Sequence, residues 1–367
     1  MPEKLPAQFR CCEARRSLVA KDRLSHSKGL QSSVSTRRLK GNGTTGNVRG
    51  MAAIHRSPTT DHPSWRIGSV PHLNARPLIY NLGAPVTLCT PARLADLMHQ
   101  RQFEVGLVPV AEVLAHDQYD IVDGIGIASH GPVRSVFLAH RGPVEKIRRV
   151  AVDPASRSSA WLVRVILQCR YGLAPEYYPR PAGATLAGHE AMLVFGDEAI
   201  GVAGQDGMVP SLDLGEEWTE WTGLPFVYAV WAVQRARGEG RGAKSDEGGA
   251  QSAVAVVAPD VRRGTGTASS RRRAPEEGGP VESGKREAAS ELAALLERLQ
   301  RAKAAGLAHL EEIIAQSTEA TPAIRREYLT QSIAYDLGEA EKQGLGKFQQ
   351  YLVELKLVAQ HELRFIP

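Results

Sequence analysis

Several features that mark common protein classes are scarce or missing in this 367-residue sequence. It has four cysteines and no C-x-x-C pair, so the cysteines predict neither a zinc site nor a redox pair, and we expect no metal. No apolar run approaches the roughly 20 residues of a membrane-spanning helix, so we expect no membrane partner. The Walker loop, H-E-x-x-H and G-x-S-x-G are absent, and "DGIGIAS" and "GTGTASS" do not complete G-x-G-x-x-G, so no cofactor is predicted.

Positive charge is concentrated at one end of the chain. The formal net charge of the chain is +5, and residues 1–50 hold eleven Lys and Arg against three Asp and Glu. The rest of the chain is therefore slightly acidic, so its charge predicts no nucleic-acid partner. The same segment is rich in Ser, Thr and Arg and lacks the apolar core of a secretory signal, although a transit peptide has a similar composition. We expect 1–64 to be a disordered basic extension, with Met51 as an alternative first residue, and a cytoplasmic protein.

From Trp65 onward, short apolar runs alternate with segments of helical periodicity, which predicts an α/β fold with mostly parallel strands. The runs from "WRIGSV" to "SVFLAHR" are assigned to the first part of one lobe, residues 65–142. The runs that begin at "RRVAV" are assigned to a second lobe, residues 143–224. A long apolar strand at 225–236 is predicted to return to the first lobe.

The last third of the chain changes character twice. Residues 237–289 are rich in Gly, Ser, Arg and Glu and almost free of aromatic residues, which predicts a disordered insertion. Residues 290–367 have helical periodicity, with an amphipathic face at Leu292, Leu295, Leu296 and Leu299. We expect these C-terminal helices to complete the first lobe by packing on it.

Two polar clusters follow predicted strands. Ser69 and Asn74 stand in "GSVPHLNARPL", and Gly131 and Ser135 stand in "SHGPVRSV". In open α/β sheets, ligands bind beyond the carboxyl ends of strands, so these positions favour a cleft for a small polar or anionic ligand. Each cluster also has a purely structural interpretation, because Asn74 and Gly131 are typical turn residues.

A third cluster lies in "VAVDPASRSSAWLVRVILQCRYG", where an apolar strand meets a predicted helix. Ser156, Arg157, Ser158 and Ser159 occupy the start of that helix, whose first backbone N–H groups have no partner within the helix. Small hydroxyl groups there either cap the helix or, with the helix dipole, bind an anion.

Five segments in order carry a resemblance to a known family: "RIGSVPHLNARPLIYNL", "FEVGLVPVAEVL", "GIGIASHGPVRSVFL", "VAVDPASRSSAWLVRVIL" and "DLGEEWTEWTGLPFVYAVWA". Together with "PAIRREYLTQSIAYDLGEAE", they resemble the chorismate dehydratases of the futalosine route to menaquinone, from Trp65 to Arg235 and from Glu291 to Pro367. The resemblance implies a type 2 periplasmic-binding-protein-like fold, with two α/β lobes around a hinged cleft. It also implies conversion of chorismate to 3-[(1-carboxyvinyl)oxy]benzoate and water, with chorismate as the only partner predicted and no prediction of oligomeric state.

With chorismate as the substrate, the polar clusters acquire roles. Asn74 and Ser135 are predicted to be catalytic, since they would orient the substrate and assist the departing hydroxyl group. No Glu or Asp offers an obvious base, so we expect the enolpyruvyl carboxylate of the substrate to take the proton, with His72 as the alternative. Arg157 either pairs with a substrate carboxylate or faces solvent or an acidic neighbour. The residues predicted to bind substrate are Ser69, Gly131, Ser156, Arg157, Ser158 and Ser159.

Three other functions stay open on the sequence. A solute-binding protein of the same fold would capture an organic anion without chemistry. The sister enzyme of the pathway, which makes dihydroxynaphthoate, shares the fold and is expected to use a histidine base. The insertion and basic tail are also compatible with a scaffold or a degenerate copy, although the cleft motifs are intact.

Overall fold

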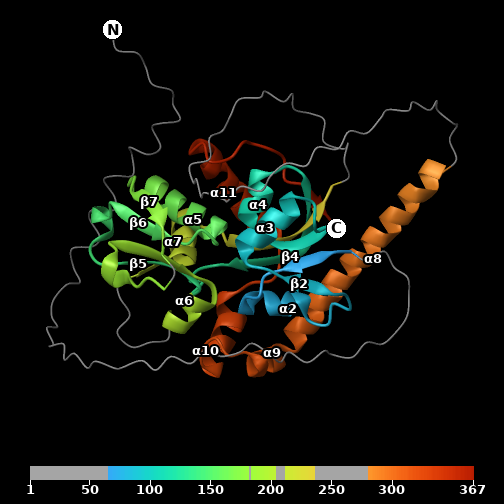
Figure 1. Cartoon of the computed structure of the whole chain (residues 1–367), viewed down its shortest axis with the longest axis horizontal. Coiled ribbons are helices and arrows are strands. Elements are labelled where there is room, and N and C mark those ends of the chain that lie inside the picture. Colours follow the sequence, from blue (N-terminus) through green and yellow to red (C-terminus); the bar gives the residue numbers. More distant parts are fainter. Residues whose placement is uncertain (1–64, 182, 204–210, 236–279) are drawn as a thin grey trace, which may run out of the picture. The chain divides into compact units, whose positions relative to one another are not determined.

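The computed structural model describes residues 65–181, 183–203, 211–235 and 280–367. The predicted basic extension at 1–64 lies outside these residues, and so does the predicted insertion as far as residue 279. Two β-sheets with helices packed against them form the framework of the described part (Figure 1). Within the described ranges, no helix is both long enough and apolar enough to cross a membrane.

The first sheet has six strands in the order β11-β4-β10-β3-β1-β2. β1 is parallel to β2 and β3, whereas β10 runs antiparallel between β3 and β4. The strands are β1 (Ile67–Ser69), β2 (Val86–Leu88), β3 (Val105–Pro109), β4 (Tyr119–Ser129), β10 (Phe226–Gln234) and β11 (Phe365–Ile366). The apolar sequence of β3 fits its burial, because a strand covered on both faces has no polar side.

The second sheet has five strands in the order β7-β6-β8-β5-β9. β6 is parallel to β7 and β8, whereas β5 is antiparallel to β8 and β9. The strands are β5 (Val136–His140), β6 (Arg149–Val152), β7 (Glu176–Pro179), β8 (Ala191–Phe195) and β9 (Ser211–Asp213). Both sheets are therefore mixed, and the prediction of mostly parallel strands underestimated their antiparallel pairs.

The chain passes from the first sheet to the second between β4 and β5, and β10 returns it. β5 therefore belongs with the second sheet, although the sequence assigned residues up to 142 to the first lobe. Consecutive strands usually lie side by side, which favours pairing of β5 with β4 when only the sequence is known. β10 falls within the predicted return strand at 225–236.

Helices and helical turns connect the strands and form most of the C-terminal part. The helices are α2 (Arg76–Ile79), α3 (Pro91–His99), α4 (Val110–Ala115), α5 (Arg157–Val165), α6 (Gly196–Ala203), α7 (Leu214–Thr222), α8 (Pro280–Ala308), α9 (Leu310–Gln316), α10 (Pro322–Glu327) and α11 (Glu339–Glu354). The 3-10 turns are η2 (Leu73–Ala75), η3 (Val144–Lys146) and η5 (Leu186–Gly188), and the π-helical turns are η4 (Ile166–Arg170) and η6 (Tyr328–Ser332). α8 begins at Pro280, so residues 280–289 are helical although the sequence placed them in the insertion.

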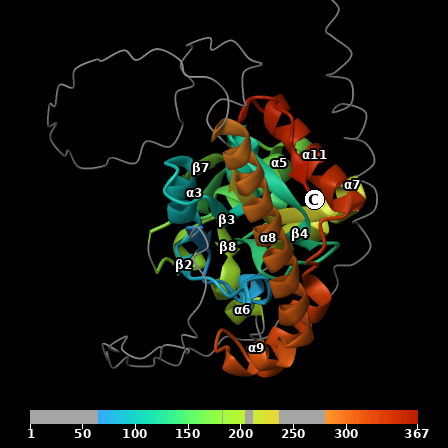
Figure 2. The same cartoon turned by 90° about the vertical axis from the view of Figure 1, so that its right-hand side faces the viewer.

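The C-terminal segment packs on the first sheet. α8 runs along this sheet and crosses α2, where a Cβ on Gly306 would overlap the backbone of Pro77 (Figure 2). Glycine at this position therefore permits the close approach of the two helices. At the far end of the chain, β11 adds a parallel strand to the edge of the sheet beside β4.

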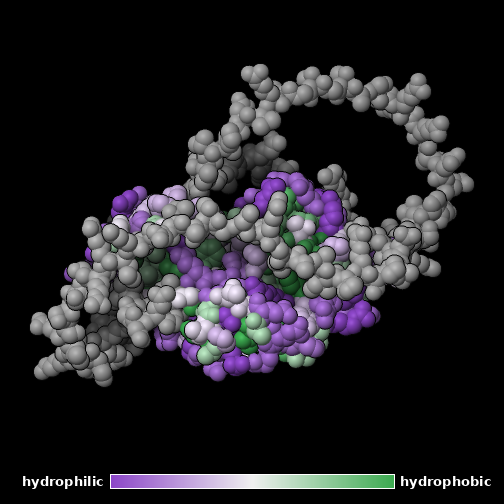
Figure 3. Space-filling view, turned by 60° about the horizontal axis from the view of Figure 1, so that its bottom comes forward, coloured by the Kyte–Doolittle hydropathy of each residue, from purple (hydrophilic) through white to green (hydrophobic). Residues whose placement is uncertain are grey.

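An aromatic cluster joins α7, β10 and α11. Trp218, Phe226 and Phe348 are fully buried, with Trp218 and Phe226 centroids 5.3 Å apart and Phe226 and Phe348 centroids 4.9 Å apart, all edge to face. Such contacts add to the free energy gained from burying the rings. On the face shown in Figure 3, hydrophilic residues predominate and hydrophobic ones form small patches among them, as expected for a chain whose large apolar side chains lie inside.

The predicted fold class, an α/β fold of two lobes with additional C-terminal helices, is confirmed by the two sheets and the two crossings between them. This is the arrangement expected of a type 2 periplasmic-binding-protein-like chain. Movement about a hinge stays a prediction.

Candidate active site

A cavity lies between the two sheets and draws its lining from both. Its apolar lining is Val70, Pro91, Leu107, Pro109, Ile127, Val136, Phe195, Gly196 and Ala229. Its polar lining is His72, Asn74, Ser135, Ser156, Arg157, Ser158, Ser159 and Tyr228. A mostly apolar cavity with a few convergent polar groups is the usual form of a small-molecule site.

The structure brings six of the eight predicted site residues to this cavity, namely Asn74, Ser135, Ser156, Arg157, Ser158 and Ser159. Ser69 is fully buried in β1, and its carbonyl accepts a hydrogen bond from the Cys89 amide at 2.9 Å. Gly131 lies in the turn after β4, where its amide donates to Thr219 Oγ1 at 2.9 Å and its φ is +104°. Neither of these two lines the cavity, and their roles in binding stay predictions.

The start of α5 forms one wall of the cavity. Ser156 is the N-cap residue by position, but its side chain makes no capping hydrogen bond, so the predicted serine cap is wrong. Ser158 is directed elsewhere, because its Oγ accepts a hydrogen bond from the Ala111 amide at the start of α4, at 3.1 Å. The amides of the first turn therefore keep no capping partner from these serines, and they remain available to an anion.

Arg157 lines the cavity and also forms ion pairs on its outer side. Its Nη2 lies 2.6 Å from Asp96 Oδ1, and its Nη1 lies 3.5 Å from Glu112 Oε2. Glu112 is almost completely buried, and burial raises the pKa of its carboxyl group. Of the alternatives left open by the sequence, the structure shows Arg157 facing acidic neighbours while it borders the cavity.

A chain of hydrogen bonds joins Asn74 to Ser135 through Tyr328. Asn74 Nδ2 donates to the Tyr328 hydroxyl at 2.9 Å, and that hydroxyl donates to Ser135 Oγ at 2.9 Å. Tyr328 is buried, and burial raises the pKa of its hydroxyl group, so it remains protonated. Since Ser135 accepts from Tyr328, its own hydrogen is free to be donated into the cavity.

Sequence reasoning missed Tyr328. It lies 254 residues after Asn74 and 193 after Ser135, at the first position of the π-helical turn η6. Its only signal in the sequence is its place in "PAIRREYLTQSIAYDLGEAE", a segment that carries the family resemblance but predicts no chemistry. π-Helical turns are frequent at functional sites, but they cannot be recognised from hydrophobic periodicity.

A second tyrosine and a partly buried carboxylate support the neighbouring turn. The Tyr228 hydroxyl lies 3.0 Å from Ser129 Oγ, and burial raises the pKa of Tyr228 well above its ordinary value. Asp213 caps α7 and also accepts hydrogen bonds from the amides of Val133, at 3.0 Å, and Arg134, at 2.6 Å. These bonds fix the residues that lead into Ser135 and β5.

His72 lines the cavity and contacts the carboxylate of Asp197. Its Nδ1 lies 3.4 Å from Asp197 Oδ2, and Asp197 Oδ1 accepts a hydrogen bond from the Leu73 amide at 3.1 Å. Burial opposes ionisation of Asp197, but the bonds from His72 and Leu73 outweigh it and hold the pKa of Asp197 below its ordinary value. His72 Nε2 is buried without a hydrogen-bond partner. Asp197 thus connects the start of α6 with η2 and is not a lining group.

Two histidines and a tyrosine surround the other carboxylate oxygen of Glu112, Oε1. Glu112 Oε1 is 3.8 Å from His99 Nδ1, 3.8 Å from His116 Nε2 and 2.6 Å from the Tyr119 hydroxyl. Burial, together with the nearby His99 and Arg157, lowers the pKa of His116 to about 4. No spacing rule links His99 with Glu112 and His116, so the sequence alone does not predict this group.

Comparison with known proteins shows relatives in sequence and in structure. The family described as menaquinone biosynthesis matches residues 65–276. The chorismate dehydratase of Thermus thermophilus is 30% identical over 189 residues, which is 46% of this chain and 69% of that protein. A protein of Archaeoglobus fulgidus aligns with a TM-score of 0.48 and 14% identity, covering 80% of this chain and 98% of its own. The periplasmic aliphatic sulphonate-binding protein of Escherichia coli aligns with a TM-score of 0.47 and 12% identity, covering 82% of this chain and 95% of its own.

Proposed function

This chain belongs to the menaquinone-biosynthesis family that includes chorismate dehydratase, and from that premise we propose that it converts chorismate to 3-[(1-carboxyvinyl)oxy]benzoate and water. The observation that carries the proposal is the meeting of Asn74, Ser135 and the start of α5 in one cavity between the sheets. The proposal describes a hydro-lyase that uses no cofactor. Its proposed location is the cytoplasm, where the enzymes of small-molecule biosynthesis find their substrates.

Chorismate carries two carboxylates, and the start of α5 suits one of them. The first-turn amides of a nine-residue helix carry partial positive charge and lack internal partners. Arg157 adds a cation beside them, although it is shared with Asp96 and Glu112. We assign the ring carboxylate to this wall, with Ser156 and Ser159 as further donors.

The proposed reaction breaks the C3–H and C4–O bonds of the ring and forms a double bond between C3 and C4. The C3 proton is vinylogous to the ring carboxylate, so the electron pair left by its removal spreads through C2 and C1 into that group. Donors at the carboxylate stabilise this dienolate-like transition state. Departure of the C4 hydroxyl then makes the ring aromatic, and the hydroxyl leaves as water after it gains a proton.

The hydrogen-bonded chain of Asn74, Tyr328 and Ser135 is proposed to assist the leaving group. Tyr328 stays protonated and donates to Ser135, so the Ser135 hydroxyl is oriented as a donor toward the cavity. A donor aimed at an oxygen that gains charge in the transition state lowers the barrier, and its loss typically costs 10²–10³ in rate, or about 3–4 kcal/mol.

The proton acceptor is proposed to be the enolpyruvyl carboxylate of the substrate. Among the described residues that line the cavity, none is Asp or Glu, and His72 is the one imidazole. The long contact of 3.4 Å between His72 and Asp197 is the observation that favours the alternative, a histidine base oriented by a carboxylate.

The first experiment mixes the full chain with chorismate and follows the products by mass spectrometry and ultraviolet absorption, against a protein-free control that measures spontaneous decay of chorismate. The expected product is lighter than chorismate by one water and has an aromatic spectrum. Tight binding of chorismate without turnover would instead indicate a solute-binding protein for organic anions or a degenerate copy. If the chain neither binds nor converts chorismate, the proposal is contradicted. The substrate of the sister enzyme would then be tested.

A further inference from the structure

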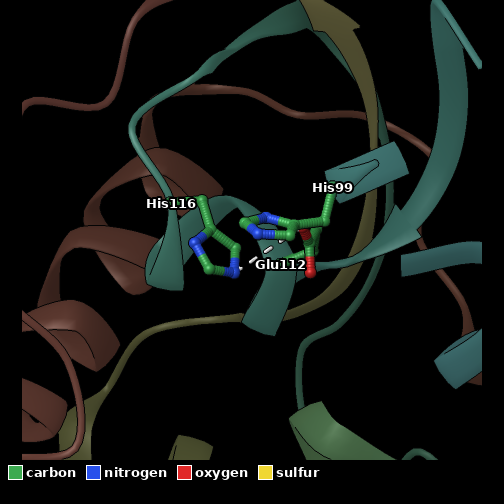
Figure 4. Close-up of side chains that lie close together, drawn as sticks. All are labelled: His99, Glu112 and His116. Atoms are coloured by element: carbon green, nitrogen blue, oxygen red, sulfur yellow. Dashed lines mark ion pairs between the residues drawn. The ribbon is translucent and has the colours of Figure 1, made fainter. Parts of the chain in front are cut away.

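Two histidines and a glutamate converge where α3 and α4 end, beside Arg157 but outside the lining of the cavity (Figure 4). His99 is the last residue of α3, Glu112 lies in α4, and His116 follows α4 directly. One potential ligand atom from each of the three lies within 4.8 Å of the others. Glu112 and His116 are four residues apart, which places them on the same face of α4.

We propose that His99, Glu112 and His116 bind a divalent transition-metal ion of the zinc class. A tetrahedral zinc ion with bonds of about 2.0–2.1 Å holds neighbouring ligand atoms about 3.3 Å apart. The two histidine nitrogens are each 3.8 Å from Glu112 Oε1, and all three ligand atoms lie within 4.8 Å of one another, so rotation of the two histidine rings has to bring these atoms toward that spacing.

The ligand types select the class of metal. Two imidazoles and one carboxylate suit zinc, cobalt, nickel and copper, whereas magnesium and calcium prefer sites built from oxygen ligands alone. Three protein ligands also leave a fourth position for water or another small ligand, as in zinc sites that are not purely structural.

The surroundings of Glu112 support a role as a metal ligand. Its side chain is 1% exposed, yet its Oε2 accepts no hydrogen bond and has only the ion pair with Arg157 at 3.5 Å. Tyr119 donates to Oε1 at 2.6 Å, and this bond orients the carboxylate while a second lone pair of Oε1 faces the histidines. The candidate ligand atom is therefore Oε1, which Tyr119 holds in place, while the buried Oε2 pairs with Arg157.

An incoming ion can reach the site from solvent. The side chain of His99 is 52% exposed and that of His116 is 35% exposed, so both rings border the surface and only the carboxylate is enclosed. Figure 4 shows the two histidine rings beside the carboxylate of Glu112.

The test uses the full chain and Co²⁺ as the probe. Four- and five-coordinate Co²⁺ absorbs visible light far more strongly than the hydrated ion, and Zn²⁺ added afterwards should abolish this absorption by displacement. His99→Gln and His116→Gln should each weaken Co²⁺ binding at least tenfold, because even outer-shell changes cost 10–100-fold in metal affinity. His309→Gln is the matched control, since this exposed histidine stacks on Tyr80 and should bind Co²⁺ as the unchanged chain does.

Three outcomes would overturn the proposal. The first is no visible Co²⁺ absorption with the unchanged chain, and the second is Co²⁺ binding that is equally strong in all three variants. The third is a thiolate charge-transfer band, which would place the ion on cysteines. Circular dichroism checks that the variants fold, and the exposed position of His99 makes His99→Gln the safer of the two. The readout is metal binding and not dehydration, so this test and that of the proposed function succeed or fail separately.

Discussion

Two walls of the cavity differ in whether backbone or side-chain groups face the substrate. The wall at α5 consists of four consecutive residues, 156–159, and the groups assigned to the substrate there include backbone amides. The wall at Ser135 depends on three side chains, and Asn74 and Ser135 meet only through Tyr328. Backbone amides survive most substitutions, whereas a chain of side chains fails when any member is lost. The α5 wall should therefore tolerate side-chain changes that the Ser135 wall does not.

The largest effect is expected from Ser135→Ala. This change removes the donor that we assign to the leaving hydroxyl, so kcat should fall about 100- to 1,000-fold with little change in KM. Steady-state kinetics with chorismate measure both constants. Ser332→Ala, which removes another buried hydroxyl outside the cavity lining, is the control and should keep normal kinetics. A variant that retains more than about a tenth of kcat would argue against Ser135 as the donor.

Tyr328→Phe should come next, with kcat lowered roughly tenfold, because Ser135 keeps its hydroxyl but loses the bond that orients it. It should also lower the free energy of unfolding by about 1–3 kcal/mol, since polar groups at both ends lose their partner. Kinetics and urea denaturation measure the two effects. The matched control is Tyr335→Phe, because the buried Tyr335 hydroxyl has no hydrogen-bond partner. Equal effects in the two variants would show that Tyr328 only fills space.

Arg157 allows the backbone and the side chain of the α5 wall to be separated. Arg157→Ala and Arg157→Pro both remove the guanidinium group, but only proline also removes the backbone N–H donor. Arg157 is the first residue of α5, a position that accepts proline. We expect the backbone N–H of residue 157 to donate a hydrogen bond to the charged carboxylate of chorismate. KM for chorismate should therefore be roughly tenfold higher in the proline variant than in the alanine variant. Circular dichroism confirms that α5 is kept in both. Equal KM values would mean that this amide does not contact the substrate.

The smallest effect is expected from His72→Phe. If the substrate carboxylate takes the proton, the ring is only part of the lining, and kcat/KM should fall less than about threefold, the scale of a lost weak contact. Asn74→Ala is the comparison, and it should cost far more, because Tyr328 then loses its donor. Rates measured over a range of pH complete the test. A large loss in His72→Phe with a small loss in Asn74→Ala would make His72 the base.

The sequence supported predictions where the determining interactions are local. Apolar runs located β1, β5, β6 and β10 well, and the start of α5 was found because strand, serines and helical periodicity follow one another directly. The hydrogen-bond partners of the serines could not be predicted in the same way. Ser158 binds the Ala111 amide in preference to its own helix, and that amide becomes a neighbour only when α4 packs beside α5.

Features that depend on distant contacts were missed or misplaced. β5 pairs with β8 and β9, which come more than 50 residues later, and nothing in "SVFLAHR" distinguishes that pairing from one with β4. Tyr328 was hidden for the same reason, because its chemistry arises from Asn74 and Ser135 and not from its sequence neighbours. The cluster of His99, Glu112 and His116 likewise requires the ends of two helices to meet.

The position of Tyr328 near the end of the chain has a consequence for how the protein is made. Translation delivers Asn74 and Ser135 early, and domains generally begin to fold while synthesis continues. The residue that joins the two emerges only after both sheets have nearly all their strands, with β11 still to come. A nascent chain on the ribosome can therefore assemble most of the framework well before it holds a complete polar wall, and the site matures only in the last steps of synthesis.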